Sequence, residues 1–279
     1  FYAGRKWLRK NFPGCDSHTY WNPDVPGRTL QMLQIMRKAG VNNLFISRFE
    51  KGLYTWLSPD GSAVLAFSPG HYADFFERVG RKGFPEIASY VSSFARNWSN
   101  ILKNGSANIP IVSMSDMSTP VRYDDIMETW NGIKSLKQAS GGAQPLSLPP
   151  IHYSNAEPFL NAVSAENLLL PVVKGERPNI WLYIHGPTHH WAISAKRTAD
   201  ACLPAAETFS TIDALLSKSF ARYPQKELTA AWEAQIYPDH GWGGKNGEIT
   251  DSMFRAKYEY ARNVGKNILA RSTSAIAVR

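Results

Sequence analysis

The stretch that decides the fold is Tyr20-Trp21-Asn22-Pro23-Asp24-Val25-Pro26-Gly27. It begins within a short run, 17–21, whose composition permits a strand, and it precedes a segment with helical spacing. Two prolines and a glycine make the loop stiff and tight, so the carboxylate of Asp24 is held where a barrel strand would end. A carboxylate in that position is well placed for catalysis, and the alternative is that Asp24 only caps the following helix.

A strand–helix–strand unit surrounds this loop. Apolar residues at helical spacing run from Leu30 to Ala39, and Gly40 is a natural residue for the end of that helix. Residues 41–46 predict the next strand, which ends near Arg48. Short connections between the three elements are typical of a βαβ unit and therefore of an α/β fold.

Strands alternate with helices up to about residue 190, and only helices follow. We therefore expect a barrel or a doubly wound sheet over residues 1–190 and a helical bundle over residues 191–279. The further predicted strands are 53–57 and 63–67, joined as a hairpin by Asp60-Gly61, and 109–114, 146–153 and 179–184. The further predicted helices are 1–12, 85–99, 123–137, 191–220 with a break near Leu203-Pro204, 224–236 and 250–269.

The composition permits a sizeable core and argues against several classes of protein. The 279 residues are 43% hydrophobic, which suits one large domain or two smaller ones. No run of about 18 apolar residues is present, so we expect no membrane span. The net charge is +8, but the basic residues are dispersed, which favours a solvated basic surface over a nucleic-acid partner and leaves an acidic partner or a polysaccharide open. Cys15 and Cys202 form no metal motif and no disulfide framework, although nothing prevents them from pairing.

Three polar residues, Asp24, Asp116 and His185, come directly after strand candidates. Because the carboxyl ends of parallel barrel strands share one face, we expect these side chains to converge. Two carboxylates on one face suit glycoside hydrolysis, in which one attacks or stabilises the oxocarbenium-like carbon and the other protonates the leaving oxygen. The alternative is that each of them is a local cap.

A second candidate site is the loop 237–244, which contains Asp239, His240 and Trp242. Its glycines let the backbone approach a ligand closely, and the indole lies beside the imidazole in sequence. Histidine is the commonest metal ligand, and Asp24 is a plausible oxygen ligand. One His and one Asp do not complete a zinc site, which needs three or more protein ligands, and the alternative is that His240 is a hydrogen-bonded structural residue.

Several blocks of sequence, in the same order and over nearly the whole chain, resemble glycoside hydrolase family 38, the retaining α-mannosidases. The first and last blocks are the most specific. The blocks are Gly4-Arg5-Lys6 to Phe12, Trp21 to Gly27, Arg37 to Val41, Trp56, Asp60-Gly61-Ser62, Met114 to Met117, His185 to Thr188 with Lys196-Arg197, Tyr223 to Leu228, Trp232-Glu233, and Asp239 to Gly243.

The resemblance implies an incomplete seven-stranded β/α barrel over residues 1–190 and part of a three-helix bundle over residues 191–279. It also implies a retaining α-glycosidase, specifically an α-mannosidase, that acts on a carbohydrate substrate by double displacement with a zinc ion on the sugar hydroxyls. Asp24 matches the nucleophile, which is also a zinc ligand, Asp116 matches the acid/base, and His240 matches a second zinc ligand. The residues expected at the substrate are Trp21, Arg48, Tyr72, His185, Asp239 and Trp242.

The resemblance also shows what this sequence lacks. The two other zinc ligands of the family come from a His-x-Asp motif, and His71 and Asp74 do not have its spacing. We expect that motif upstream of Phe1 and β-sandwich domains beyond Arg279, so the expected partners include the remaining segments of the same enzyme, in a periplasmic, secreted or lysosome-like compartment. Val25-Pro26-Gly27 departs from the usual Phe and Gly after the nucleophile. The alternatives are a catalytically inactive carbohydrate-binding relative and an enzyme for another α-linked or acidic glycan.

Overall fold

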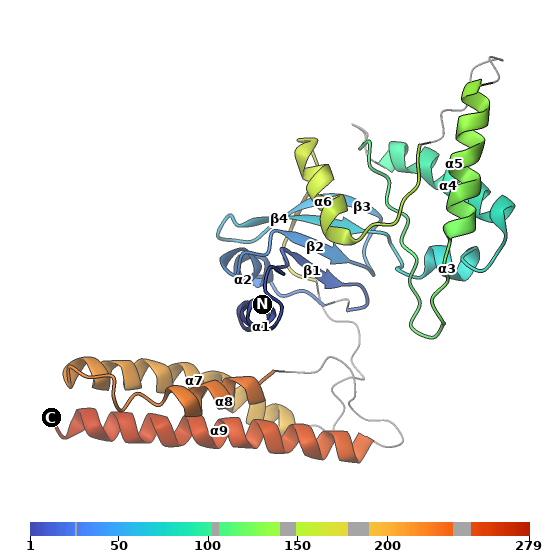
Figure 1. The fold of residues 1–279 in the computed structure, drawn as a ribbon. Coiled ribbons are helices and arrows are strands. Elements are labelled where there is room, and N and C mark those ends of the chain that lie inside the picture. Colours follow the sequence, from blue (N-terminus) through green and yellow to red (C-terminus); the bar gives the residue numbers. More distant parts are fainter. Residues whose placement is uncertain (26, 102–105, 140–148, 178–189, 237–246) are drawn as a thin grey trace. The chain divides into compact units, whose positions relative to one another are not determined.

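The computed structural model describes residues 1–25, 27–101, 106–139, 149–177, 190–236 and 247–279 (Figure 1). The chain divides into two compact units, Phe1–Ile180 and Trp181–Arg279. The first unit combines a sheet with helices, and the described part of the second is helical. The chain is therefore a mixed α/β protein, in agreement with the fold class predicted above.

The first unit is built on a five-stranded sheet with the order β1-β2-β4-β3-β5. Strands β1, β2 and β4 are parallel neighbours, so their carboxyl ends lie at the same edge. Strand β3 is antiparallel to β4 and parallel to β5. The β3–β4 hairpin confirms the prediction from Asp60-Gly61, and Gly61 takes the left-handed φ of +83° that such a turn requires. The strands are β1 Thr19–Asn22, β2 Asn43–Ile46, β3 Gly52–Leu57, β4 Ala63–Ser68 and β5 Val172–Lys174.

Two apolar cores, one on each face, hold the sheet between helices. Leu44 and Ile46 of β2 pack into one core with α2 (Met32–Lys38), whereas Phe45 between them packs into the other with α6 (Ala156–Ala165). Strand β2 is buried along its whole length, which is why its sequence is continuously apolar after Asn43. Each large side chain buried in this way stabilises the fold by about 1.5–3 kcal/mol.

The remaining helices of the first unit are α1 Tyr2–Asn11, α3 Asp74–Arg78, α4 Phe84–Ile101 and α5 Asp124–Ala139. Helices α1, α4 and α5 agree with the predicted segments, but α3, α6 and strand β5 were not predicted. In α6 the missed signal is Asn155, whose side chain accepts a hydrogen bond from the backbone N–H of Glu157 and so caps the helix.

The predicted strand 109–114 is wrong. Ile109, Val112 and Met114 do pack against the α6 core, but the segment forms no ladder with any described strand. Residues 149–153 of another predicted strand are not in a strand either, and the predicted strand 179–184 lies outside the described residues. A short apolar run only signals burial, and burial does not require strand pairing.

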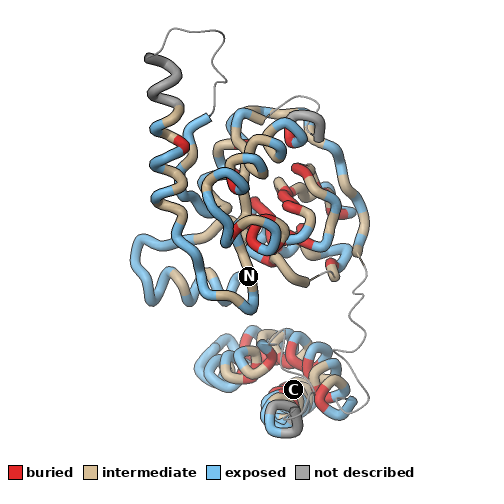
Figure 2. Tube along the Cα trace, turned by 90° about the vertical axis from the view of Figure 1, so that its right-hand side faces the viewer, coloured by how far each residue is buried: buried red, intermediate tan, exposed pale blue. Residues whose placement is uncertain are grey.

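The second unit contains the helices α7 (His190–Leu216), α8 (Gln225–Ala234) and α9 (Gly247–Ala277). Its core is rich in alanine, including Ala199, Ala206, Ala231 and Ala261, and small side chains let helices approach closely. Figure 2 shows the buried residues on the inner sides of the helices. Pro204 does not break α7 as predicted, because it lies between buried Leu203 and Ala206, whose packing holds the helix together.

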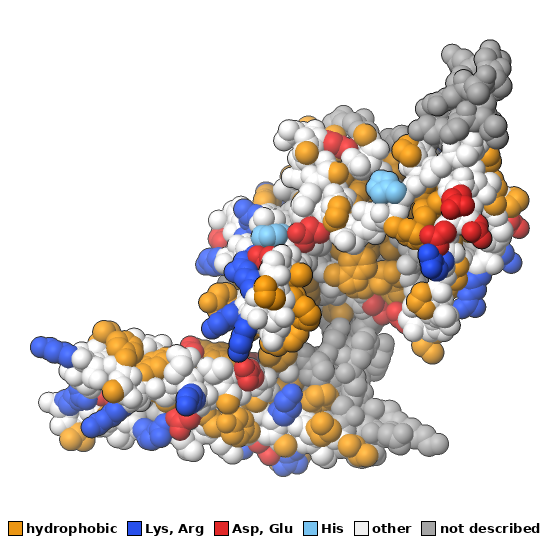
Figure 3. All heavy atoms as spheres, viewed as in Figure 1, with side chains coloured by type: hydrophobic (Ala, Val, Ile, Leu, Met, Phe, Trp, Pro, Cys, Tyr) orange, Lys and Arg blue, Asp and Glu red, His pale blue; other side chains and the backbone are white. Residues whose placement is uncertain are grey.

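The charges of the second unit are scattered. On the face seen in Figure 3, lysine and arginine side chains lie among apolar and acidic ones. None of the helices in the described part of the chain has the length and apolar character that a membrane crossing requires. Cys15 is exposed and Cys202 is buried, and both are free thiols.

Candidate active site

Three residues predicted at the site follow the three parallel strands in turn. Asp24 comes two residues after β1, Arg48 comes two residues after β2, and Tyr72 comes four residues after β4. Since the carboxyl ends of these strands lie at one edge, the fold brings the three side chains together.

Asp24 and Arg48 form an ion pair. Both Nε and Nη2 of Arg48 lie 2.6 Å from Oδ1 of Asp24. Burial lowers the pKa of Arg48, but the hydrogen bond and the charge of Asp24, with a smaller contribution from Tyr72, raise that pKa above its ordinary value overall. Arg48 therefore stays positively charged and orients the carboxylate through one oxygen.

The backbone of Arg48 is in a strained conformation that its neighbours maintain. Its φ of +56° is left-handed, which costs a non-glycine residue roughly 1–2 kcal/mol. The N–H of Arg48 donates to the carbonyl of Gly70 at 3.0 Å, and the hydroxyl of Ser47 donates to the same carbonyl at 2.9 Å. The N–H of Tyr72 donates to the Ser47 hydroxyl at 3.2 Å. The loops after β2 and β4 are thus braced against each other, which fits strain being retained where a side chain must be aimed.

Tyr72 connects the ion pair to the second predicted carboxylate. Its hydroxyl donates to Oδ2 of Asp116 at 2.5 Å, and its side chain is almost completely buried. Burial raises the pKa of Tyr72 most, followed by the hydrogen bond to Asp116 and the negative charges of Asp24 and Asp116, while Arg48 opposes the shift. The hydroxyl consequently keeps its proton and remains a donor. The charges of both carboxylates raise the pKa of this one hydroxyl, so Asp24 and Asp116 both lie in the neighbourhood of Tyr72.

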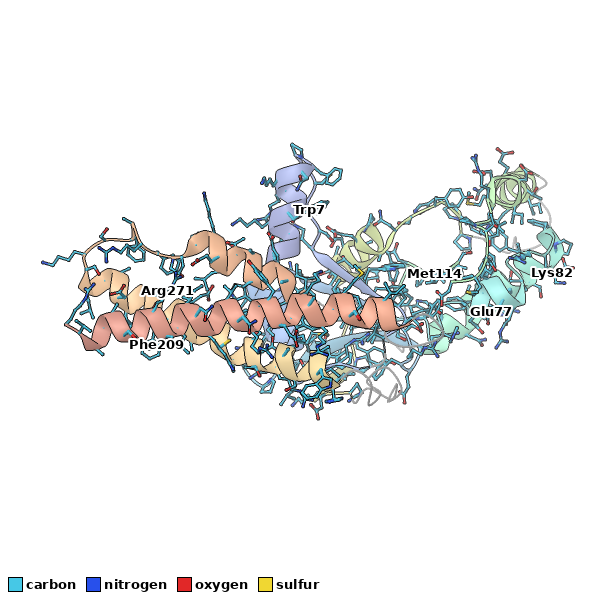
Figure 4. All side chains as sticks on the ribbon, turned by 90° about the horizontal axis from the view of Figure 1, so that it is seen from below. Trp7, Glu77, Lys82, Met114, Phe209 and Arg271 are labelled. Atoms are coloured by element: carbon cyan, nitrogen blue, oxygen red, sulfur yellow. The ribbon has the colours of Figure 1, made fainter. Side chains whose placement is uncertain are left out.

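Asp116 lies beside Tyr72 although it does not follow a strand. It is exposed and lies in an irregular segment, 106–123, that is anchored to the α6 core by Met114, labelled in Figure 4. The strand-end argument that singled out Asp116 is therefore wrong, although the residue lies beside Tyr72. Side-chain packing of the preceding segment, and not a ladder, positions it.

A cleft of about 710 Å³ opens next to the ion pair. Its volume is in the range of small-molecule sites. The guanidinium of Arg177 lies 5.1 Å from the ring of Phe49 and 5.5 Å from that of Trp56, and His71 stacks on Tyr72 at 4.8 Å. The cleft is lined by Arg48, Phe49, Glu50, Tyr54, Gly70, His71, Val173 and Arg177.

Two residues that position the site were missed from sequence. Ser47 directly follows β2, so the strand-end rule that singled out Asp24 would have found it. Arg28 has no such signal. It is buried, with 5% exposure, and its guanidinium donates to backbone carbonyls of the loop that carries Asp24.

The other predicted site residues are placed differently. Trp21 stacks on Phe45 with a centroid distance of 4.0 Å, and nearly half of its surface stays exposed. Within the residues that the structure describes, no group of three or more His, Cys, Asp or Glu side chains is placed to hold a metal. The remaining predicted residues, His185, Asp239, His240 and Trp242, lie outside the described residues.

Comparisons with known proteins agree with this architecture. Residues 1–192 match the sequence profile described as "Glycosyl hydrolases family 38 N-terminal domain". The protein named "Alpha-mannosidase" of Saccharomyces cerevisiae (strain ATCC 204508 / S288c) is 26% identical over 102 residues, which cover 31% of this chain and 9% of the yeast protein. The crystal structure of an alpha-mannosidase from Enterococcus faecalis V583 has a TM-score of 0.61 and 15% identity, and the match covers 99% of this chain and 31% of that one. This chain therefore spans a third or less of these relatives.

Proposed function

Because the chain belongs to glycosyl hydrolase family 38, we propose that it is the part of an α-mannosidase that carries both catalytic carboxylates. The enzyme hydrolyses α-linked sugars with retention of configuration. One observation supports this most: Arg48 pairs with Asp24, Tyr72 bonds Asp116, and the charges of both carboxylates raise the pKa of Tyr72. In the same proposal, the sheet is part of a seven-stranded barrel, and residues 191–279 belong to a three-helix bundle.

Asp24 is the nucleophile. With Oδ1 held by Arg48, Oδ2 attacks the anomeric carbon, the bond to the leaving oxygen breaks, and Asp116 donates its proton to that oxygen. The product is a covalent glycosyl-enzyme on Asp24. In the second step Asp116 accepts a proton from water, the water oxygen attacks the anomeric carbon, and the carboxylate of Asp24 is released.

Arg48 and Tyr72 prepare the two carboxylates for these steps. The positive charge of Arg48 orients Asp24, and the hydroxyl of Tyr72 fixes Oδ2 of Asp116, whose segment has no ladder to hold it. The adjacent cleft has room for a sugar ring and its leaving group. Preorganisation of this kind is worth much more than binding the substrate alone, because it aligns the reacting atoms before the reaction begins.

We also propose that the enzyme depends on zinc. Asp24 supplies one ligand, and the others would come from His240 and from other segments of the enzyme, because the described residues contain no group of three potential ligands. A bound zinc ion would orient and polarise the sugar hydroxyls. The nucleophilic attack and the proton transfers are made by Asp24 and Asp116. Metal analysis of the full-length enzyme, with activity before and after chelation, tests this dependence.

Azide rescue in the full-length protein tests the two catalytic roles. Asp24→Ala should lower kcat on an aryl α-mannoside by more than ~10³-fold, and added azide should give a β-glycosyl azide. Asp116→Ala should spare the first step for a substrate with a good leaving group, and azide should give the α-glycosyl azide. Asp200→Ala, at an exposed aspartate of α7 paired with Lys196, is the control and should leave kcat unchanged.

Other results would replace the proposal. Full activity of Asp24→Ala would refute its role as nucleophile. A wild-type protein that binds sugars but contains no zinc and hydrolyses nothing would instead be an inactive carbohydrate-binding relative. A panel of aryl α-glycosides, with neutral and acidic sugars, shows whether mannose is the preferred substrate.

A further inference from the structure

We propose that Arg28 is a positioning residue that sets the geometry of the nucleophile Asp24. This inference rests on the proposed function, since it assigns Arg28 a role in the reaction of Asp24. The guanidinium of Arg28 donates to three backbone carbonyls of the segment that carries Asp24. It acts through the backbone of the loop.

Arg28 contacts residues that precede Asp24 in the sequence and residues that follow it. Nη2 donates to the carbonyl of Asn22 at 3.2 Å, and Nη1 donates to the carbonyl of Gly27 at 2.6 Å and to that of Val25. One planar cation thus gathers carbonyls that precede and follow the nucleophile. Because these hydrogen bonds have a charged donor, they are about twice as strong as neutral ones.

The loop needs these donors because its own backbone supplies few. Pro23 and Pro26 have no N–H group, so the tight turn around Asp24 has two donors fewer than a loop of other residues would have. A buried carbonyl without a partner costs about 1–3 kcal/mol. A guanidinium offers five donors in a fixed fork, whereas a lysine ammonium is a point charge that cannot span three separated carbonyls equally well.

Arg28 is itself paired with Arg177, which lies three residues after strand β5. Its N–H donates to the carbonyl of Arg177 at 2.8 Å, and the N–H of Arg177 donates back at 2.9 Å. The side chain of Arg177 then lies over the rings of Phe49 and Trp56. Phe49 directly follows Arg48, so Arg177, which pairs with Arg28, also contacts the neighbour of the residue that binds Asp24. A shift of Arg28 would therefore move Asp24 relative to Arg48.

The experiment compares Arg28→Gln and Arg28→Lys in the full-length enzyme. We expect kcat to fall about 100-fold for Gln and less for Lys, with KM changed by less than about 3-fold, because a misplacement near 1 Å costs that much in rate. A 5-fluoro α-glycosyl fluoride should label Asp24 of the Gln variant more slowly by a similar factor. Arg37→Gln, at an exposed arginine of α2 whose side chain donates to Asn42, is the matched control and should change neither measurement.

Hydrogen exchange provides a measurement that does not depend on activity. In Arg28→Gln, a peptide covering residues 20–30 should exchange at least about 10-fold faster than in the wild type, while a peptide covering β2 should not change. Unchanged exchange and unchanged labelling would overturn the proposal. If the wild type has no glycosidase activity but residues 20–30 exchange faster in the variant, the proposed function is refuted, and the role of Arg28 in holding the loop is supported. If β2 also exchanges faster, Arg28 stabilises the whole unit and the positioning role is refuted.

Discussion

Replacing Arg48 separates its role at Asp24 from its effect on stability. The residue is paired with Asp24 through its side chain and has a left-handed φ of +56° in its backbone. Arg48→Gln removes the charge and keeps the backbone strain, whereas Arg48→Gly removes both. We therefore expect the two variants to lose activity equally and to differ in stability.

The size of each effect follows from the contacts. Hydrogen bonds to a charged group contribute about 1.5–3 kcal/mol, and since Arg48 is a third exposed, solvent screening favours the lower end. That corresponds to a fall in kcat of roughly 10–30-fold. A left-handed arginine costs roughly 1–2 kcal/mol, less about 0.5–1 kcal/mol for the greater freedom of an unfolded glycine. The Gly variant should therefore be more stable than the Gln variant by about 0.5–1 kcal/mol.

The assay uses the full-length enzyme, with kcat on an aryl α-mannoside and urea unfolding monitored by tryptophan fluorescence. Arg37 is the matched control, because it is an exposed arginine in helix α2, where glycine costs about 1 kcal/mol relative to a good helix former. At this position we expect the opposite order of stability from that at Arg48. Arg37→Gly should be less stable than Arg37→Gln, and kcat should be unchanged in both variants. If both Arg48 variants kept kcat within 2-fold of the wild type, the role of the ion pair would be refuted. A Gly variant less stable than the Gln variant would refute the backbone argument.

Two predictions concern stability elsewhere. A Cβ at Gly265 would lie 2.6 Å from Sγ of Cys202, so Gly265→Ala should destabilise the protein by about 1–3 kcal/mol in thermal unfolding. In a Cys202→Ala background the same substitution should lose most of that cost, and equal costs in both backgrounds would exclude this contact as the cause. Burial and the hydrogen bond to Asp74 raise the pKa of Tyr90, so its stabilisation is complete below about pH 10 and is lost as the pH rises further, because the unfolded chain ionises first. Tyr90→Phe should lose less stability than the wild type between pH 9 and 11 in urea titrations, and identical losses would contradict this assignment.

Local signals in the sequence account for much of the site. The runs before Pro23 and before Ser47 are short and are followed within two residues by Asp24 and Arg48, and they form β1 and β2 as predicted. Asp24 and Arg48 then reach the same edge because parallel neighbouring strands end together. The Asp60-Gly61 turn is equally local, since only a glycine takes its φ without strain.

The failures arise where long-range packing decides. The apolar segment 109–114 reads like a buried strand, but it is buried without a ladder, and periodicity cannot tell these outcomes apart. The hydrogen bond between Tyr72 and Asp116 joins residues 44 positions apart. No spacing in the sequence predicts such a contact, because it depends on how a whole irregular segment packs against the core.

The amino-acid sequence by itself determined strands β1 and β2, the β3–β4 hairpin, the stiffness of the Asp24 loop and the strand ends near which Asp24 and Arg48 lie. These properties depend on backbone preferences and side-chain periodicity over a few residues. Only the tertiary structure decided that Tyr72 bonds Asp116 and that Arg28 gathers the carbonyls around Asp24. The physical reason is that a buried donor bonds whichever acceptor the folded chain brings within about 3 Å, and that proximity is set by the packing of segments far apart in sequence.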